Sequence, residues 1–177
     1  NLLDDIGVEV KRHDTSTDKF TLELLANRGD HHCYVGLARE ISGRTGAATC
    51  RPGFVDLNTG KSPVDLVLNT ELCSRYSATL LERTGDASAL TEDEFAPLEA
   101  AEIHTVSPAV DATNLSNLEF GQPTHCFDAD TIVGPMEIRL SREGEKAWPL
   151  FTEEHVTVPT GSIVIADDEK ILTIAKN

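Results

Sequence analysis

The residues whose types and spacing could do chemistry lie between Asp111 and Asp130. The sequence reads Asp-Ala-Thr-Asn at 111–114, and Gln122 and His125 follow within Glu-Phe-Gly-Gln-Pro-Thr-His. A hydroxyl, an amide and an imidazole that meet in one place can orient a water molecule or bind a polar ligand. The pattern therefore predicts either a polar pocket around His125 or a hydrogen-bonded structural turn, and spacing alone leaves both open.

Two local signals position these residues. The Ser-Pro pair at 107–108 is typical of a helix start, with serine as N-cap and proline in the first helical position. The short helix that begins there carries Thr113 and Asn114. The Gly-Gln-Pro turn at 121–123 then predicts that the chain folds back and brings His125 toward them.

The hydrophobic pattern predicts an α+β protein with helices first and a strand-rich second half. We expect a mixed or antiparallel sheet module with flanking helices at 47–177, preceded by a small helix-strand lead-in domain at 1–46. A helix should follow Asp30 and end near Gly43 or Gly46. The expected strands cover 20–24, 64–68, 76–81, 136–140, 147–151, 162–166 and 171–175.

The start of the first long helix contains an Asp-His-His-Cys run at 30–33, which invites a metal interpretation. Adjacent residues on a helix point about 100° apart and do not easily grip one ion. We therefore expect Asp30 to cap the helix, the two histidines to be partly exposed, and no metal to bind.

Composition narrows the classes of protein. The formal charge of −15 argues against nonspecific nucleic-acid binding, which needs a basic surface. The sequence has no apolar run of membrane-spanning length, so we expect a soluble, cytoplasmic protein. Nucleophile-elbow, zincin and nucleotide-loop motifs do not occur. The acidic runs at 92–94 and 167–169 are expected to be solvated.

Three ordered segments closely resemble the beta subunit of phenylalanyl-tRNA synthetase. The main one joins Asp-Ala-Thr-Asn at 111–114 to the stretch from Leu118 to Asp128, which is similar to that subunit's editing module, its third and fourth domains. Residues 22–41 resemble the preceding small domain, and 73–78 resemble the entry to the editing module. The resemblance spans nearly the whole chain.

The resemblance implies hydrolysis of tyrosine wrongly esterified to tRNA(Phe), without a cofactor. By position, Thr113 and His125 would be catalytic, and Asn114 and Gln122 would line the pocket. His104 aligns where the family usually has an arginine. The implied partners are tRNA, through its aminoacyl end, and the synthetase alpha subunit if the chain is a fragment.

The resemblance also implies a module truncated at its C-terminal end. The family continues into a glycine-rich loop and a segment with a glutamate that recognises the tyrosine hydroxyl, and this sequence stops at Asn177, where that loop should begin. Two hypotheses follow. The chain is an editing hydrolase, or it is a catalytically silent fragment or stand-alone paralogue that binds RNA, a ligand or a protein.

Overall fold

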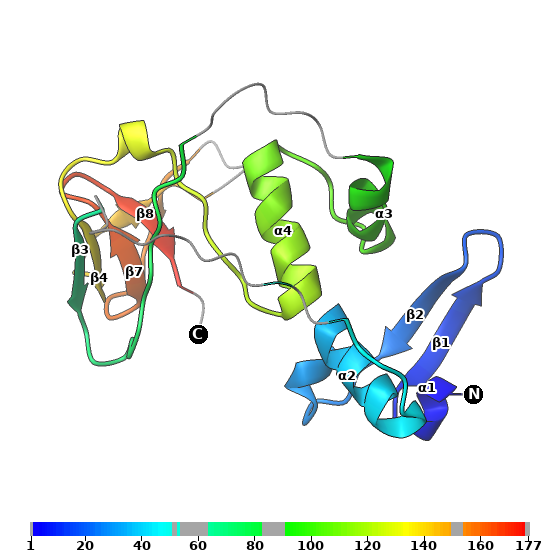
Figure 1. The fold of residues 1–177 in the computed structure, drawn as a ribbon. Coiled ribbons are helices and arrows are strands. Elements are labelled where there is room, and N and C mark those ends of the chain that lie inside the picture. Colours follow the sequence, from blue (N-terminus) through cyan, green and yellow to red (C-terminus); the bar gives the residue numbers. More distant parts are fainter. Residues whose placement is uncertain (1, 51–52, 54–63, 83–90, 150–153, 176–177) are drawn as a thin grey trace. The chain divides into compact units, whose positions relative to one another are not determined.

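The computed structural model describes residues 2–50, 53, 64–82, 91–149 and 154–175. They form two compact units that interleave along the chain. Unit 1 combines residues 1–54 with 85–126, and unit 2 combines 55–84 with 127–177. Helices dominate unit 1 and strands dominate unit 2 (Figure 1), which confirms the predicted α+β class. The domain boundary at 46/47 remains a prediction.

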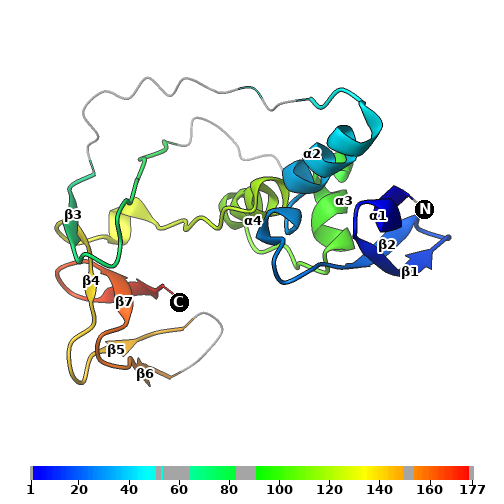
Figure 2. The same ribbon diagram turned by 90° about the horizontal axis from the view of Figure 1, so that it is seen from below.

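Unit 1 contains a short helix and a β-hairpin near its start, followed by its longer helices. Its elements are α1 (Leu2–Asp5), β1 (Glu9–Asp14), β2 (Lys19–Glu23), η1 (Gly29–His31), α2 (Tyr34–Thr45), α3 (Glu92–Ala100) and α4 (Pro108–Phe120). β1 and β2 pair antiparallel, with α1 beside them (Figure 2). The polar stretch from His13 to Lys19 contains the end of β1, the turn at 15–18 and the first residue of β2. Lys19 Nζ lies 3.2 Å from Glu102 Oε1, beyond the end of α3.

The helix α2 is capped by Cys33 at its N-terminus and by Gly46 at its C-terminus. Cys33, and not the predicted Asp30, is its N-cap, and the Cys33 sulfur accepts from the Gly36 N–H. Asp30 lies instead in the short 3-10 helix η1. The prediction that both histidines are partly exposed is wrong for His31, which is 2% exposed. Gly46 caps the C-terminus in a left-handed conformation (φ 74°), as its position predicted.

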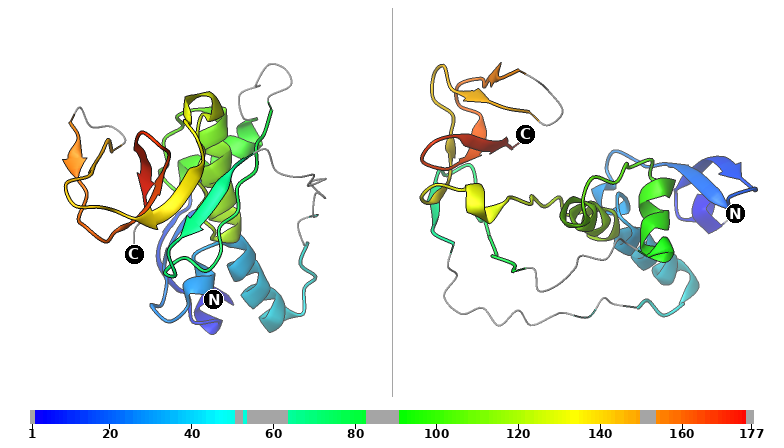
Figure 3. Two further views of the ribbon diagram at one scale, coloured as in Figure 1. Left: turned by 90° about the vertical axis from the view of Figure 1, so that its left-hand side faces the viewer. Right: turned by 90° about the horizontal axis from the view of Figure 1, so that it is seen from above.

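The two later helices of unit 1 pack against each other (Figure 3). α3 begins directly after Thr91 and continues through Pro97 to Ala100, so the proline does not interrupt it. α4 confirms the helix predicted from the Ser-Pro pair. The Ser107 hydroxyl accepts from the Val110 N–H at 3.4 Å, and Pro108 is the first helical residue.

Unit 2 is built on one six-stranded mixed sheet. Its strands are β3 (Leu66–Asn69), β4 (Met136–Leu140), β5 (Lys146–Ala147), β6 (Val156–Thr157), β7 (Ile163–Ala166) and β8 (Ile171–Ile174). Their order is β3-β4-β7-β8-β5-β6, and the β3–β4 and β5–β8 pairs are parallel. The strand predicted at 76–81 is wrong, since these residues form no ladder. The strand predicted at 147–151 is shorter, and residues 150 and 151 lie outside the described chain.

The sheet buries apolar side chains on both faces, because successive residues of a strand point to opposite sides. One cluster contains Val164 and Ala166 with Val158. The other contains Ile165 with Met136 and Ile138. Alternation along the single strand β7 therefore feeds both clusters.

Among the described residues of unit 2, the charged side chains Arg139 and Asp167 are buried, and for Asp167 this contradicts the prediction. The Asp167 carboxylate, predicted to be solvated, is fully buried. It accepts backbone N–H bonds from Val133, Glu169 and Lys170. Burial opposes ionisation, but these N–H groups outweigh it and hold the pKa of Asp167 below 3.8.

Within the described chain, no helix is long and apolar enough to cross a membrane.

The ion pair between Arg139 and Glu145 should make unit 2 sensitive to acid. The Arg139 guanidinium holds the pKa of Glu145 below 4.5, through bonds of 2.7 and 2.8 Å. A carboxyl whose pKa is lowered by folding stabilises the fold above its unfolded pKa, and this contribution disappears as the pH falls through the folded value. Glu145→Gln should cost about 2 kcal/mol at pH 7. Urea unfolding at pH 7 and pH 3 should show that this difference shrinks in acid.

Glu143→Gln is the matched control, because Glu143 is exposed in the same turn. It should change stability little at either pH. A Glu145→Gln cost of the same size at both pH values would contradict the assigned role of the pair.

Candidate functional site

The helix α4 carries two of the predicted site residues, Thr113 and Asn114, both half-buried. The Thr113 hydroxyl donates to the Val110 carbonyl of the previous turn at 2.6 Å. Its proton is therefore committed, and its oxygen lone pairs remain to accept from a ligand. The Asp111 carboxylate, 5% exposed, fixes the start of the helix by accepting from the Val106 N–H at 2.9 Å.

The turn after α4 carries the other two motif residues. Gly121 ends the helix in a left-handed conformation (φ 72°) and donates to the Asn117 carbonyl at 2.8 Å. Gln122 and His125 follow on an exposed segment of unit 1. Its path beyond the helix can be followed in Figure 1. The helix and its C-cap thus position a hydroxyl, an amide and an imidazole within one unit.

The structure places these residues on one helix and its flanks without enclosing them. His104 is exposed in the segment between α3 and α4. Two cavities of the described residues, one in each unit, are lined by none of the five predicted site residues. Together these five residues, on α4 and on the segments before and after it, offer one acceptor hydroxyl, two amides and two imidazoles.

Gly121 ends α4 and begins the segment that carries His125, so a side chain at this position should disturb that segment. A Cβ at this position would lie 3.2 Å from the Cys33 Cβ, and the positive φ disfavours any side chain. Gly121→Ala should destabilise unit 1 by about 2 kcal/mol, from the left-handed conformation plus this crowding. Hydrogen exchange should also become faster in residues 121–126.

Gly46→Ala is the control for that prediction. Gly46 has a similar φ of 74°, and nothing lies within 4 Å of its added Cβ. Its cost should be only the conformational part, about 1 kcal/mol. Equal costs at the two glycines would contradict the proposed contact between Cys33 and Gly121.

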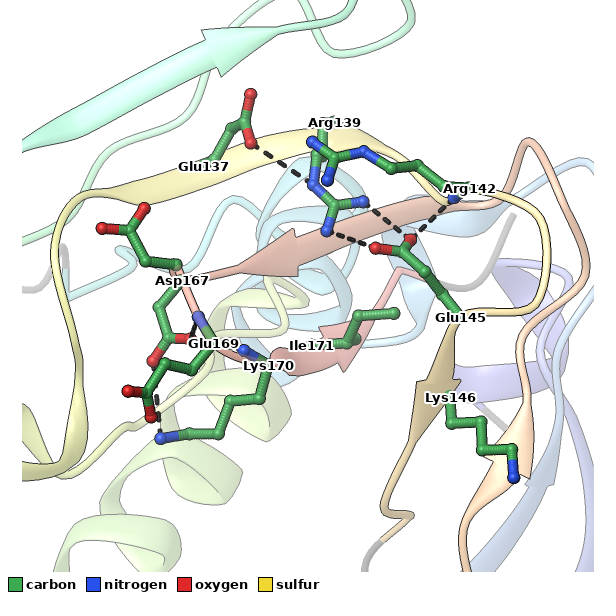
Figure 4. A pocket seen from close by; sticks show the side chains of 10 residues that line it. Glu137, Arg139, Arg142, Glu145, Lys146, Asp167, Glu169, Lys170 and Ile171 are labelled. Carbon is green, nitrogen blue, oxygen red and sulfur yellow. Dashed lines mark hydrogen bonds and ion pairs between the residues drawn. The ribbon is translucent and has the colours of Figure 1, made fainter.

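A second polar site, in unit 2, was not predicted from the sequence. It is a cavity of about 380 Å³ lined largely by charged side chains (Figure 4). Arg139 and Glu145 pair on one side of it, and Asp167, Glu169 and Lys170 gather on the other. The lining residues are Glu137, Arg139, Arg142, Glu145, Lys146, Asp167, Asp168, Glu169, Lys170 and Ile171.

The charges of this cavity are mostly satisfied by one another. Besides its bonds to Glu145, Arg139 lies 3.3 Å from Glu137, and Lys170 lies 3.4 Å from Asp167. The cavity therefore offers mainly a structural ion-pair network. The sequence signals for it are the alternation of Glu137 and Arg139 along β4 and the acidic run at 167–169, which was predicted to be solvated.

Comparisons with known proteins identify the class of this module. Residues 72–177 match the model of the B3/4 domain family. The matched range contains α4, the turn after it and five of the six strands of the sheet, whereas β3 precedes it. The chain belongs to the B3/4 domain family.

Its relatives are beta subunits of phenylalanine–tRNA ligase. The chain is 34% identical to the subunit of Neisseria meningitidis serogroup B over 96% of its own length and 22% of the relative. It is 35% identical to that of Carboxydothermus hydrogenoformans over 87% of the chain and 19% of the relative. For Pseudomonas syringae pv. syringae the values are 34%, 97% and 21%. The resemblance found in the sequence motifs is confirmed, and the chain spans about a fifth of the length of these relatives.

Proposed function

We propose that this chain is an editing module that binds the aminoacyl end of tRNA(Phe) and hydrolyses tyrosine esterified to it by mistake. The observation that carries the proposal is the position of Thr113, Asn114, Gln122 and His125. They lie on one helix and its C-terminal turn, inside the region that matches the B3/4 family. This arrangement supports contact with a small polar group attached to a larger molecule that stays outside.

The committed proton of Thr113 suggests its role. Because the hydroxyl donates to Val110, it meets a ligand only as an acceptor. The α-ammonium group of an esterified amino acid and the phenolic hydroxyl of tyrosine are both donors. Thr113 therefore fits the binding and orientation of the tyrosyl group. The Asn114 amide, one residue away, adds donors and an acceptor of its own.

His125 fits the role of a general base. Its imidazole would take a proton from a water molecule as the water oxygen bonds to the ester carbonyl carbon. The bond from that carbon to the ribose oxygen then breaks, and the ribose oxygen takes up a proton. The products are free tyrosine and tRNA with a free terminal hydroxyl. No covalent intermediate with the protein is required.

Selectivity would come from the single hydroxyl that distinguishes tyrosine from phenylalanine. A site that hydrogen-bonds this hydroxyl is left with unpaired polar groups when phenylalanine enters. Sites of this kind reject the analogue that lacks the hydroxyl by roughly 10⁴-fold or more. The correct product, phenylalanyl-tRNA(Phe), would therefore survive.

The same proposal names the partners. tRNA would approach through its aminoacyl end, because a chain of charge −15 offers no broad basic surface for the rest of the duplex. The synthetase alpha subunit is the proposed protein partner, in the cytoplasm. Salt should therefore affect binding less steeply than it does for proteins that grip many phosphates.

Deacylation of tyrosyl-tRNA(Phe) by the purified chain tests this function. We expect His125→Ala to lower the single-turnover rate by about 100-fold, the size of a typical general-base contribution. Thr113→Val, which keeps the shape and removes the acceptor, should mainly weaken binding. His32→Ala, at an exposed histidine of the same unit, should leave the rate unchanged. Equal rates for His125→Ala and wild type would contradict the role of His125.

A binding function is the second candidate, and the exposure of the site favours it. His125, Gln122 and His104 are all exposed, and neither of the two cavities described above includes them. A silent module would bind RNA, a ligand or a protein through the same residues. It would show saturable binding that Thr113→Val weakens, with no turnover above the rate in buffer.

A further inference from the structure

Three potential metal ligands meet in unit 1, away from the proposed editing residues. Asp30 and His31 come from η1, and Glu40 comes from the middle of α2. The His31 Nε2 atom lies 3.9 Å from Asp30 Oδ2 and 3.7 Å from Glu40 Oε2. One ligand atom from each residue lies within 4.8 Å of the other two. A single ion could contact all three.

The state of His31 points to a ligand at this place. Its side chain is 1% exposed, yet neither ring nitrogen has a hydrogen-bond partner in the described part of the chain. Buried polar groups are nearly always paired, and an exception calls for an ion or a water molecule. The Nε2 atom faces the Asp30 and Glu40 carboxylates at 3.9 and 3.7 Å, so the three groups form a donor set that one cation could share.

Arg28 already supplies one positive charge. Its Nη2 atom lies 2.9 Å from Asp30 Oδ2 and 2.6 Å from Glu40 Oε2, and its Nε lies 3.0 Å from Asp30 Oδ1. Two carboxylates and one guanidinium leave a net charge of −1 beside the imidazole of His31. The Arg28 side chain is 29% exposed, so its tip can move toward solvent.

We propose that Asp30, His31 and Glu40 bind a divalent first-row transition metal ion, with Zn²⁺ the best fit. One imidazole nitrogen and two carboxylate oxygens suit zinc, whereas Ca²⁺ and Mg²⁺ prefer oxygen ligands alone. Nη2 of Arg28 would leave Asp30 Oδ2 and Glu40 Oε2, and its Nε would keep Asp30 Oδ1. The two carboxylates then balance the ion, and the remaining hydrogen bond orients one of them.

The ion would join η1 to α2 and so hold the start of unit 1 together. Glu40 follows Gly36 by one helical turn, and the Asp30 carbonyl lies directly over Gly36. The three ligands therefore approach one another without rearrangement of the backbone. The sequence did not reveal the site, because its third ligand lies ten positions beyond Asp30 and only the fold brings it near.

Titration of the metal-free chain with ZnCl₂ by calorimetry, repeated with Co²⁺ by absorption, tests the proposal. We expect one ion per chain and a Co²⁺ spectrum without a thiolate charge-transfer band, which separates this site from the cysteines. Glu40→Gln and His31→Gln should each weaken binding by about 100-fold. His32→Gln, at the exposed neighbouring histidine, should bind like wild type.

Arg28→Met gives a change of opposite sign, which a purely structural role would not produce. Without the competing guanidinium, Zn²⁺ should bind more tightly and raise the melting temperature more than it does in wild type. The proposal is overturned if wild type shows no saturable binding. It is equally overturned if Glu40→Gln leaves Zn²⁺ binding unchanged. This second variant keeps the test decisive if His31→Gln fails to fold.

Discussion

Replacement of Gly36 by alanine is expected to destabilise unit 1 by about 3 kcal/mol. An added Cβ would lie 1.6 Å from the Asp30 carbonyl oxygen and 2.7 Å from its carbon. Both atoms belong to the backbone, so no flexible side chain can move aside. The 3-10 helix η1 would have to separate from α2, and the cluster at Arg28, Asp30 and Glu40 would separate with it.

Gly43→Ala provides the matched comparison on the same helix. Nothing lies within 4 Å of a Cβ added at Gly43. Alanine should therefore stabilise this position by up to about 1 kcal/mol, because it favours the helix over glycine. Urea unfolding and hydrogen exchange of the α2 amides measure both variants. A Gly36→Ala protein as stable as wild type would contradict the observed packing of η1 on α2.

Ile138→Ala is expected to destabilise unit 2 by about 3 kcal/mol, from lost apolar burial and the cavity that remains. Ile138 is 1% exposed in the middle of β4, which lies between β3 and β7. Its side chain packs in one cluster with Met136 and Ile165. The cavity would open where three elements of the sheet meet, so it cannot collapse easily.

Leu140→Ala tests whether burial is the cause. Leu140 lies on the same strand and the same face, two residues further, but is 39% exposed. Its truncation should cost only about 1 kcal/mol. Hydrogen exchange of the β7 amides, which pair with β4, is the most direct measure. Similar losses for the two variants would show that the face around Ile138 is not a core.

Local signals with a specific physical cause predicted the fold best. The Ser107 cap and Pro108 placed the start of α4 correctly, because a helix start needs acceptors for its first N–H groups. The alternation in 136–140 and the continuous apolar run in 162–166 predicted two central strands, the second of which is buried on both faces.

Sequence patterns failed to predict strands whose formation depends on a partner strand. The part of β1 beyond Val10 is exposed on every residue, so it carries no hydrophobic pattern and its pairing with β2 defines it. Residues 76–81 have apolar positions but find no partner strand in the described structure. β6, two residues long, is too short to leave a pattern.

The candidate site also has features that the sequence predicted and features that only the fold shows. Spacing and the family resemblance selected Thr113 and His125, and the helix between Pro108 and Phe120 appeared as expected. The commitment of the Thr113 proton and the burial of His31 could not be predicted, because each depends on an atom that only the folded backbone brings near. Glu40 is the clearest case, since no local pattern connects it with His31.

The central claim is that this module distinguishes tyrosyl-tRNA(Phe) from phenylalanyl-tRNA(Phe) and hydrolyses the former. Single-turnover deacylation of both by the wild-type chain, at one salt concentration, tests it most directly. We predict release of tyrosine clearly above the rate in buffer, and release of phenylalanine at that rate. Equal rates for the two substrates, or no release of tyrosine above buffer, would contradict the claim.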